Sequence, residues 1–345
     1  MEKEFINFIH SLHLIYLFII IGITLYTLSK GADLFVDGAV ALSEEFHISK
    51  IIIGATIVSL GTTIPEVSVS VMAALRGDSS LSLGNAVGSI ICNTGLIIGI
   101  STLISPLRIQ KKETIRQNWL QITSASILIL ISLPYTKPKL LLTGTGYISK
   151  GEGFFLLLLL FGYIYLSLKW IKKDRVENII PKDAEDAVGN NFLIFTNLSL
   201  GIILVIVSSK ILIPTVQITA IRLHIPSSVI GATIVAFGTS LPELITSITA
   251  ARKGHGELAI GNVTGANILN ILFVIGSAAV FSKKGFTVTP HFFILYFPSM
   301  LAILGIFSVG ILINKKMIPR IFGFFILLIY ITITIIGYST NKLVI

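Results

Sequence analysis

The most constraining feature of this sequence is a series of long apolar runs, among them Leu14–Leu28, Phe154–Leu168, Phe292–Ile313 and Ile321–Ile336. With their flanks, these runs reach the roughly 20 residues that a helix needs to cross a hydrocarbon layer about 30 Å thick. Only 12% of the 345 residues are charged, whereas soluble proteins are about one-quarter charged. The sequence shows no strands of alternating polarity, which argues against a membrane β-barrel. We therefore predict an all-α polytopic membrane protein.

The N-terminal sequence and the net charge further limit what kind of membrane protein this chain can be. The first apolar run lacks a strongly basic start and a small-residue cleavage site, so we expect a true span and not a removed signal peptide. The net charge is +9, which in a membrane protein reflects loop lysines that face the cytoplasm and anionic lipid, so no nucleic-acid partner is expected. Cys92 is the only cysteine, which excludes an intrachain disulfide and leaves it as a small packed residue.

The chain also contains an internal duplication. Residues 54–77 return as residues 231–254, and residues 81–99 return as residues 258–276, at a constant offset of 177. Between positions 54 and 99, 21 of 46 residues are identical to their repeat mates. We therefore divide the chain into a first repeat unit (1–172, with its motif at 54–99), a central cytoplasmic loop (173–191) and a second unit (192–345, with its motif at 231–276).

Each unit is expected to hold five membrane spans. The ten predicted helices lie near 12–43, 50–75, 80–105, 118–134, 153–171, 192–221, 227–252, 257–281, 290–313 and 318–338. Because five is odd, the second unit must enter the membrane in the opposite direction, as in many secondary transporters whose site lies between inverted repeats near the midplane. With the N-terminus outside, 15 Lys and Arg residues fall on the cytoplasmic side and 9 outside, which favours that orientation.

The duplicated segments Gly61–Glu66 and Gly238–Glu243 carry the chemistry. Pro65 removes a backbone donor and clashes with the carbonyl of Gly61, so the helix should kink or break and free its carbonyls. A carboxylate within the membrane is functional by default, and no Lys or Arg recurs in either motif. Carboxylate, hydroxyl and carbonyl oxygens suit hard cations such as Ca²⁺ and Na⁺, whereas zinc or copper would require His or Cys ligands.

The following span of each repeat offers neutral ligands. The segments Gly84–Ser89 and Gly261–Ala266 carry glycines four residues apart, which allow close helix packing. Asn93 and Asn270 follow one turn later and could complete the ligand shell through their amide oxygens, or could instead form interhelical hydrogen bonds. Ser89 is a hydroxyl candidate, although its repeat mate is Ala266.

These motifs resemble the two α-repeats of the cation/calcium antiporter superfamily, in its sodium/calcium exchanger branch. The resemblance covers nearly the whole chain and implies that Glu66 and Glu243 are the central cation ligands. It further implies contributions from the oxygens of Thr62, Thr63, Thr239, Ser240, Ser89 and Asn93 and from the carbonyls near Ser59 and Ala236. Prokaryotic members of the family can carry Asp where this chain has Asn270, so the implied pocket holds two formal negative charges instead of three.

The expected function is therefore a secondary antiporter that exchanges Ca²⁺ for Na⁺ by alternating access, with the first and sixth spans sliding past the rest. The transported ions are substrates, and we expect no cofactor and no enzyme activity. A Ca²⁺/H⁺ antiporter and, from another class, a cation channel remain alternatives. We expect a monomer in a prokaryotic plasma membrane.

Several polar residues fall outside this site. Asp33 and Asp37 are expected to form a structural or gating ion pair with Lys30 or Lys210. The remaining candidates for roles at the membrane interface are His47, His224, Trp119 and Trp170.

Overall fold

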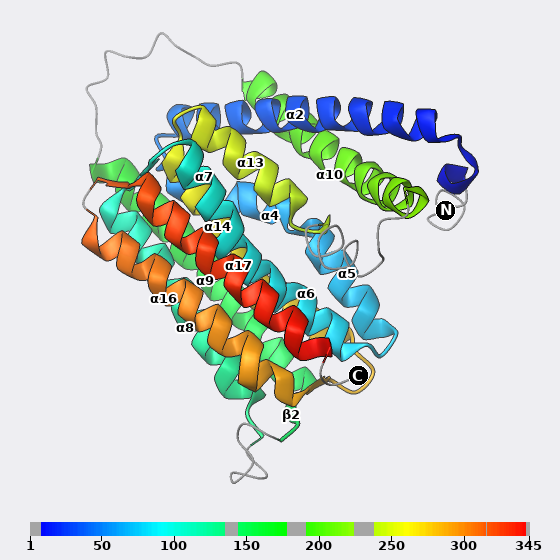
Figure 1. Ribbon diagram of the computed structural model, residues 1–345. Helices are drawn as coiled ribbons and strands as arrows, with labels where there is room; N and C mark the ends of the chain where they lie inside the picture. The colour runs from blue at the N-terminus through cyan, green and yellow to red at the C-terminus, as the bar shows by residue number, and fades with distance from the viewer. Residues whose placement is uncertain (1–7, 135–143, 178–190, 224–237, 315, 343–345) are drawn as a thin grey trace, which may run out of the picture.

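The computed structural model describes residues 8–134, 144–177, 191–223, 238–314 and 316–342, without the side chains of 171–177 and 337–342. Most of its helices run side by side in one bundle, and α2 (Leu14–Glu45) and α10 (Asn191–Arg222) pack together and lie across one side of that bundle, at an angle to the other helices (Figure 1). Both members of this pair are exposed along much of their length, since only 22% of α2 and 33% of α10 is buried in their most apolar stretches. One small cluster of buried apolar side chains between the two helices also packs against Leu241 and Ile245, and a second cluster joins the pair to residues just before α2.

Six helical segments in the described part of the chain are long and apolar enough to cross a membrane. They are α2, α6 with η2 and α7 (Ser79–Ile104), α9 (Lys150–Glu177), α10, α14 with η6 and α15 (Gly256–Phe281), and η7 with α16 (Phe292–Ile313). A bent pair, described below, brings the number to seven. The helices α8 (Lys111–Ser132) and α17 (Arg320–Lys342) complete the bundle.

Two expected boundaries differ from the observed ones. α8 begins at Lys111, seven residues before the predicted start at 118, because its early polar residues, such as Gln117, turn into the protein. α9 continues to Glu177, so the first residues of the predicted 173–191 loop are helical, while 178–190 lie outside the described residues. The predicted span at 227–252 is described only from Gly238 onward.

The first repeat contains the predicted helix break. One helical stretch runs over α3 (Lys50–Ile53), η1 (Gly54–Val58) and α4 (Ser59–Thr62), and α5 (Ile64–Leu75) continues at an angle of 47°. Thr63 lies at the bend, and Pro65 occupies the first turn of α5, where its missing N–H costs no helical hydrogen bond. In the second repeat α13 (Leu241–Arg252) likewise begins with Pro242 in its first turn.

The corner after each of these helices is built in the same way. Gly77 and Gly254 adopt φ values of +85° and +81°, the left-handed conformation that favours glycine after a helix end. In both corners the next residue donates to the carbonyl five residues back, from Asp78 to Ala73 and from His255 to Ala250. The repeated sequence therefore produces a repeated local structure.

Two short antiparallel strand pairs join the halves of the chain. β1 (Leu107–Arg108) pairs with β4 (Met317–Ile318), and β2 (Gly146–Ile148) pairs with β3 (Phe286–Val288). α7 leads into β1, and α14 begins against it, since a Cβ on Gly256 would lie 2.6 Å from the backbone nitrogen of Arg108. α15 leads into β3, which contacts α6. The homologous segments α6–α7 and α14–α15 thus run in opposite directions between the two strand pairs.

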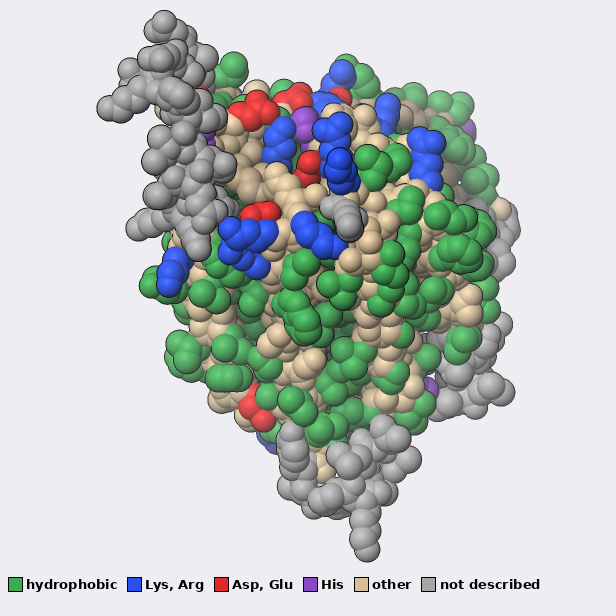
Figure 2. Space-filling model, turned by 90° about the vertical axis from the view of Figure 1, so that its left-hand side faces the viewer, with side chains coloured by type: hydrophobic (Ala, Val, Ile, Leu, Met, Phe, Trp, Pro, Cys, Tyr) green, Lys and Arg blue, Asp and Glu red, His purple; other side chains and the backbone are tan. Residues whose placement is uncertain are grey.

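Burial divides the helices into inner and outer members. Nearly every residue of α14 is buried, whereas many large apolar side chains of α2, α9, α10 and α17 are exposed. On the face drawn in Figure 2, hydrophobic side chains form a broad belt and most charged side chains gather near one end. This distribution suits a protein whose sides face hydrocarbon.

Candidate cation site

Two buried glutamates lie at the start of homologous helices. Glu66 is in the first turn of α5 and Glu243 is in the first turn of α13, and both side chains are 0% exposed. The N-terminus of a helix carries a partial positive charge and free N–H groups, which favour an anionic side chain there. The helix start at each Pro-Glu segment therefore creates a local environment that stabilises the carboxylate.

Each glutamate accepts a hydrogen bond from a hydroxyl group of the opposite repeat. Thr63 Oγ1 donates to Glu243 Oε1 at 3.4 Å, and Ser240 Oγ donates to Glu66 Oε1 at 3.5 Å. Thr63 and Ser240 are repeat mates, so the two contacts are related by the duplication. Both distances are at the long limit for a hydrogen bond, and the second oxygen, Oε2, of each glutamate has no hydrogen-bond partner among the described residues.

A second pair of hydrogen bonds between the two repeats accompanies the first pair. Thr62 Oγ1 donates to Asn262 Oδ1 at 3.3 Å, and its mate Thr239 donates to Asn85 Oδ1 at 3.1 Å. The amide nitrogens of the same asparagines reach back to the backbone carbonyls of Glu243 and Glu66, at 3.5 and 3.4 Å. Each asparagine therefore connects the glutamate helix of its own repeat to the threonine of the Gly-Thr-x-x-Pro-Glu motif in the other repeat.

Asn85 and Asn262 were not among the ligands predicted from the sequence. Their signal was present, since both are identical across the repeats within the Gly-Asn-x-x-Gly motif. The spacing of the glycines indicated close packing, and the structure shows that packing: a Cβ on Gly265 would lie 2.4 Å from the carbonyl oxygen of Ala55. Close approach of α14 to η1 is what brings Asn262 within reach of Thr62.

The remaining predicted ligands lie around this core. Ser89 Oγ lies 3.1 Å from Ser240 Oγ, within hydrogen-bond distance, and the Ser59 carbonyl accepts from Thr63 N at 2.9 Å. Asn93 and Asn270 are both 0% exposed, and each begins a π-helical segment, η2 (Asn93–Ile97) and η6 (Asn270–Ile275). Segments of this kind occur frequently at functional sites. Ala236 lies outside the described residues.

The donor set consists of oxygens. The described residues contain no group of three or more His, Cys, Asp and Glu side chains that could hold a metal ion, and no ion pair recorded among them involves Glu66 or Glu243. Two carboxylates with free oxygens, surrounded by hydroxyls, amides and a helix break, fit a hard cation with mostly neutral ligands. The partnerless Oε2 atoms and the Asn93 and Asn270 oxygens are the observations that support this fit.

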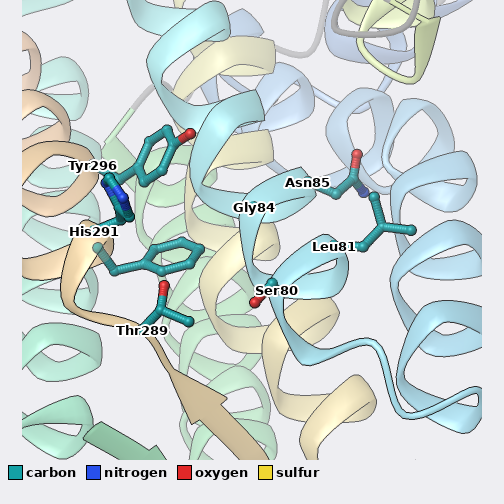
Figure 3. A pocket seen from close by; sticks show the side chains of 8 residues that line it. Ser80, Leu81, Gly84, Asn85, Thr289, His291 and Tyr296 are labelled. Atoms are coloured by element: carbon teal, nitrogen blue, oxygen red, sulfur yellow. The ribbon is translucent and has the colours of Figure 1, made fainter. Parts of the chain in front are cut away.

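A pocket of about 350 Å³ lies beside this arrangement, between the start of α6 and η7 (Phe292–Tyr296). Figure 3 shows the side chains of His291 and Tyr296 on one side of α6 and those of Leu81 and Asn85 on the other. Asn85, the partner of Thr239, is the residue that the pocket and the site share. The glutamates themselves do not line it.

The prediction for Asp33 and Asp37 was wrong about their partner. Lys253 Nζ lies 2.8 Å from Asp37 Oδ1 and 3.3 Å from Asp33 Oδ1, whereas Lys30 lies over the Tyr26 ring at 5.9 Å. Lys253 follows α13 directly. The ion pairs therefore join α2 to the end of the helix that carries Glu243.

The other polar candidates have separate positions. Nearby, Lys50 pairs with Glu44 at 3.0 Å, and burial, followed by the charge of Lys50, lowers the pKa of His255. Cys92 is buried as expected, and Arg116 stacks on Trp170 at 5.3 Å. The last three candidates are His47, with φ of +52°, Trp119, which is exposed, and His224, which lies outside the described residues.

The fold and these contacts together define a membrane protein in which two buried glutamates are surrounded by side-chain oxygens from both repeats. A sequence profile of the family described as "Sodium/calcium exchanger protein" matches residues 15–169 and 193–338. The chain belongs to this sodium/calcium exchanger family.

Individual relatives agree with this assignment. The chain is 31% identical to the sodium/calcium exchanger MaX1 of Methanosarcina acetivorans, over 76% of this chain and 83% of that protein. It is 32% identical to the inner membrane protein YrbG of Escherichia coli, over 76% and 78% of the two chains. A solved structure of the sodium-calcium exchanger NCX_Mj superposes with a TM-score of 0.77 at 27% identity, covering 93% of this chain and 98% of that one.

Proposed function

We propose that this protein is a secondary antiporter that exchanges Ca²⁺ for Na⁺ at a site between Glu66 and Glu243. The observation that carries the proposal is the pair of fully buried carboxylates whose Oε2 atoms have no partner among the described residues. Two negative charges balance one Ca²⁺ or two Na⁺, and a buried carboxylate is costly unless it is paired. Both kinds of ion accept the same carboxylate, hydroxyl and carbonyl oxygens, so they would compete for one site.

The architecture that we propose has ten transmembrane helices in two inverted units of five, with the site at the membrane midplane. The opposite directions of α6–α7 and α14–α15 and the duplication-related hydrogen bonds at the glutamates support this arrangement. Alternating access would follow from sliding of α2 and α10 against the other helices. Their mutual packing and their exposed outer faces support treatment of this pair as one moving body.

The proposed location is a prokaryotic plasma membrane, with the N-terminus outside and the central loop in the cytoplasm. The relation to an inner membrane protein of E. coli supports the membrane, and the excess of Lys and Arg on the predicted cytoplasmic side supports the orientation. A monomer is proposed, since one chain supplies all of the site residues described above.

The test is Ca²⁺ uptake into proteoliposomes loaded with Na⁺. Glu66→Gln and Glu243→Gln should each abolish uptake, because an amide keeps the shape of the side chain but removes the charge that binds the cation. Glu44→Gln, which changes an exposed carboxylate outside the site, is the matched control and should leave uptake unchanged. Uptake that survives both site substitutions would exclude this site.

The counter-ion is tested separately with imposed gradients. Uptake should follow an outward Na⁺ gradient and should not follow an outward K⁺ or H⁺ gradient without Na⁺. Uptake driven by a proton gradient alone would instead establish a Ca²⁺/H⁺ antiporter. Single-channel currents without a counter-ion requirement would establish a channel.

A further inference from the structure

Helix α8 carries a buried polar face that the exchange mechanism described above does not use. Gln117, Asn118 and Gln121 are at most 4% exposed. At the same offset of 177, the second repeat carries Ile294, Leu295 and Pro298, so the polar face has no counterpart there. Amides placed inside a membrane protein are costly unless they are hydrogen-bonded.

Two of these amides, Asn118 and Gln121, belong to a series of hydrogen bonds that reaches the candidate cation site. Ser308 Oγ of α16 donates to Asn118 Oδ1 at 3.0 Å, and Gln121 Nε2 donates to the same oxygen at 2.9 Å. Asn267 Nδ2 of α14 donates to Gln121 Oε1 at 3.1 Å, and Asn93 Nδ2 donates to Asn267 Oδ1 at 3.3 Å. This series of hydrogen bonds thus connects four helical segments and ends at Asn93, a residue predicted to bind the cation.

This series of hydrogen bonds makes Asn93 and Asn270, the two asparagines predicted to bind the cation, inequivalent. The amide nitrogen of Asn93 is held by Asn267, which leaves Asn93 Oδ1 without a hydrogen-bond partner in the described structure. Neither amide atom of its mate Asn270 has a partner there. The reason is in the sequence, because the repeat mate of Asn267 is Ile90, which has no group to offer Asn270.

Asn267 is itself fixed in orientation. Its Nδ2 donates both to Thr94 Oγ1 at 2.8 Å and to Gln121 Oε1 at 3.1 Å, which turns its Oδ1 toward Asn93. An amide nitrogen can only donate and an amide oxygen can only accept. The orientation of one amide therefore determines that of the next along this series of hydrogen bonds.

We propose that Asn267 is a positioning residue that fixes the amide of Asn93 so that its oxygen is available to the transported cation. Asn270 has no corresponding hydrogen-bond partner among the described residues. The site then combines one amide that is held by a hydrogen bond with one that is not, and affinity for Ca²⁺ depends on a residue that does not itself contact the ion. This inference rests on the proposed function of the site.

The experiment is a double-mutant cycle measured as Ca²⁺ affinity of the purified full-length protein by titration calorimetry. Asn267→Leu should weaken Ca²⁺ binding about tenfold, the size expected when a buried hydrogen-bonded group loses its partner. In an Asn93→Ala background there is no side-chain amide at this position, so the orientation that Asn267 sets no longer matters. Asn267→Leu should there change the affinity by less than about twofold.

Two further variants test the positioning without altering Asn267 itself. Thr94→Val removes one of the two acceptors that orient Asn267 and should weaken Ca²⁺ binding about threefold, less than Asn267→Leu. Gln121→Met removes the other acceptor and should also weaken binding about threefold. It provides the same cycle if Asn267→Leu does not fold.

An equal loss with and without the Asn93→Ala substitution would overturn the proposal, since it would show that Asn267 acts only through packing. An unchanged affinity in Asn267→Leu, or in both Thr94→Val and Gln121→Met, would overturn it as well. Absence of Ca²⁺ binding by the unaltered protein would instead refute the proposed function on which the inference rests.

Discussion

The contact between Gly265 and the broken helix offers a sharp test of how the site is held together. A Cβ at position 265 would lie 2.4 Å from Ala55 O, 2.5 Å from Ala55 Cα and 2.6 Å from Ser59 Oγ. Ordinary contact begins at 3.4 Å, so Gly265→Ala must separate α14 from η1 by 3.4 − 2.4, or about 1 Å. Backbone atoms form most of this contact, so side-chain rotation cannot relieve it.

The energetic effect can be isolated with a matched glycine. Replacing glycine by alanine inside a helix contributes about 1 kcal/mol of stability through backbone entropy. Gly162 lies in α9, and a Cβ added there would meet nothing within 4 Å, so Gly162→Ala shows this gain alone. Gly265→Ala receives the same gain but also overpacks, at a cost of about 1–3 kcal/mol, so it should be less stable than Gly162→Ala by about that amount.

The functional effect follows from the same displacement. Asn262 lies on α14, and its 3.3 Å contact with Thr62 cannot survive an added separation of about 1 Å. We therefore expect Gly265→Ala to weaken Ca²⁺ binding about tenfold, whereas Gly162→Ala should bind normally. Thermal unfolding in detergent and Ca²⁺ titration measure the two effects. Equal melting temperatures and equal affinities for the two variants would refute this account of how α14 positions the site.

Three further predictions concern contacts around the site. Lys253→Asp should impair exchange in the uptake assay. The double variant Lys253→Asp with Asp37→Lys should restore most of the exchange, because the 2.8 Å ion pair is formed again with reversed charges. Absence of any restoration would exclude a role for the pair. Tyr163→Phe removes the donor to the Ala55 carbonyl at 2.5 Å and should lower stability by about 1 kcal/mol, measured by thermal unfolding; an unchanged midpoint would contradict this. Cys92 is 4% exposed and should react with a polar maleimide, followed by mass spectrometry, only after denaturation; rapid labelling of the folded protein would show that its surroundings open.

The sequence was most informative where a local rule determined the structure. Pro65 predicted the break in the first repeat because proline acts on its own helix, and the structure has a 47° bend at Thr63. Glu66 and Glu243 were predictable as a pair because the duplication repeats them. These features need no knowledge of how distant segments pack.

Contacts between segments were predicted less well, for a physical reason. The start of α8 was placed too late because a polar side chain counts as loop in a hydropathy pattern, whereas Gln117 and Gln121 are buried against other helices. Asp37 was assigned to lysines on α2 and α10, although Lys253 reaches it from the end of α13. Partners of this kind depend on helix directions and corners that only the complete fold specifies.

The hydrogen bonds that each glutamate accepts from the other repeat have a consequence for biosynthesis. Glu66 receives its hydroxyl from Ser240, and β1 has its partner in β4 at Met317–Ile318, so the first half of the chain emerges from the ribosome long before its partners exist. A half inserted alone would hold an unpaired carboxylate and an unpaired strand edge. The nascent first half is therefore the most vulnerable stage of assembly, and the two halves should need each other to escape degradation even when they are expressed as separate polypeptides.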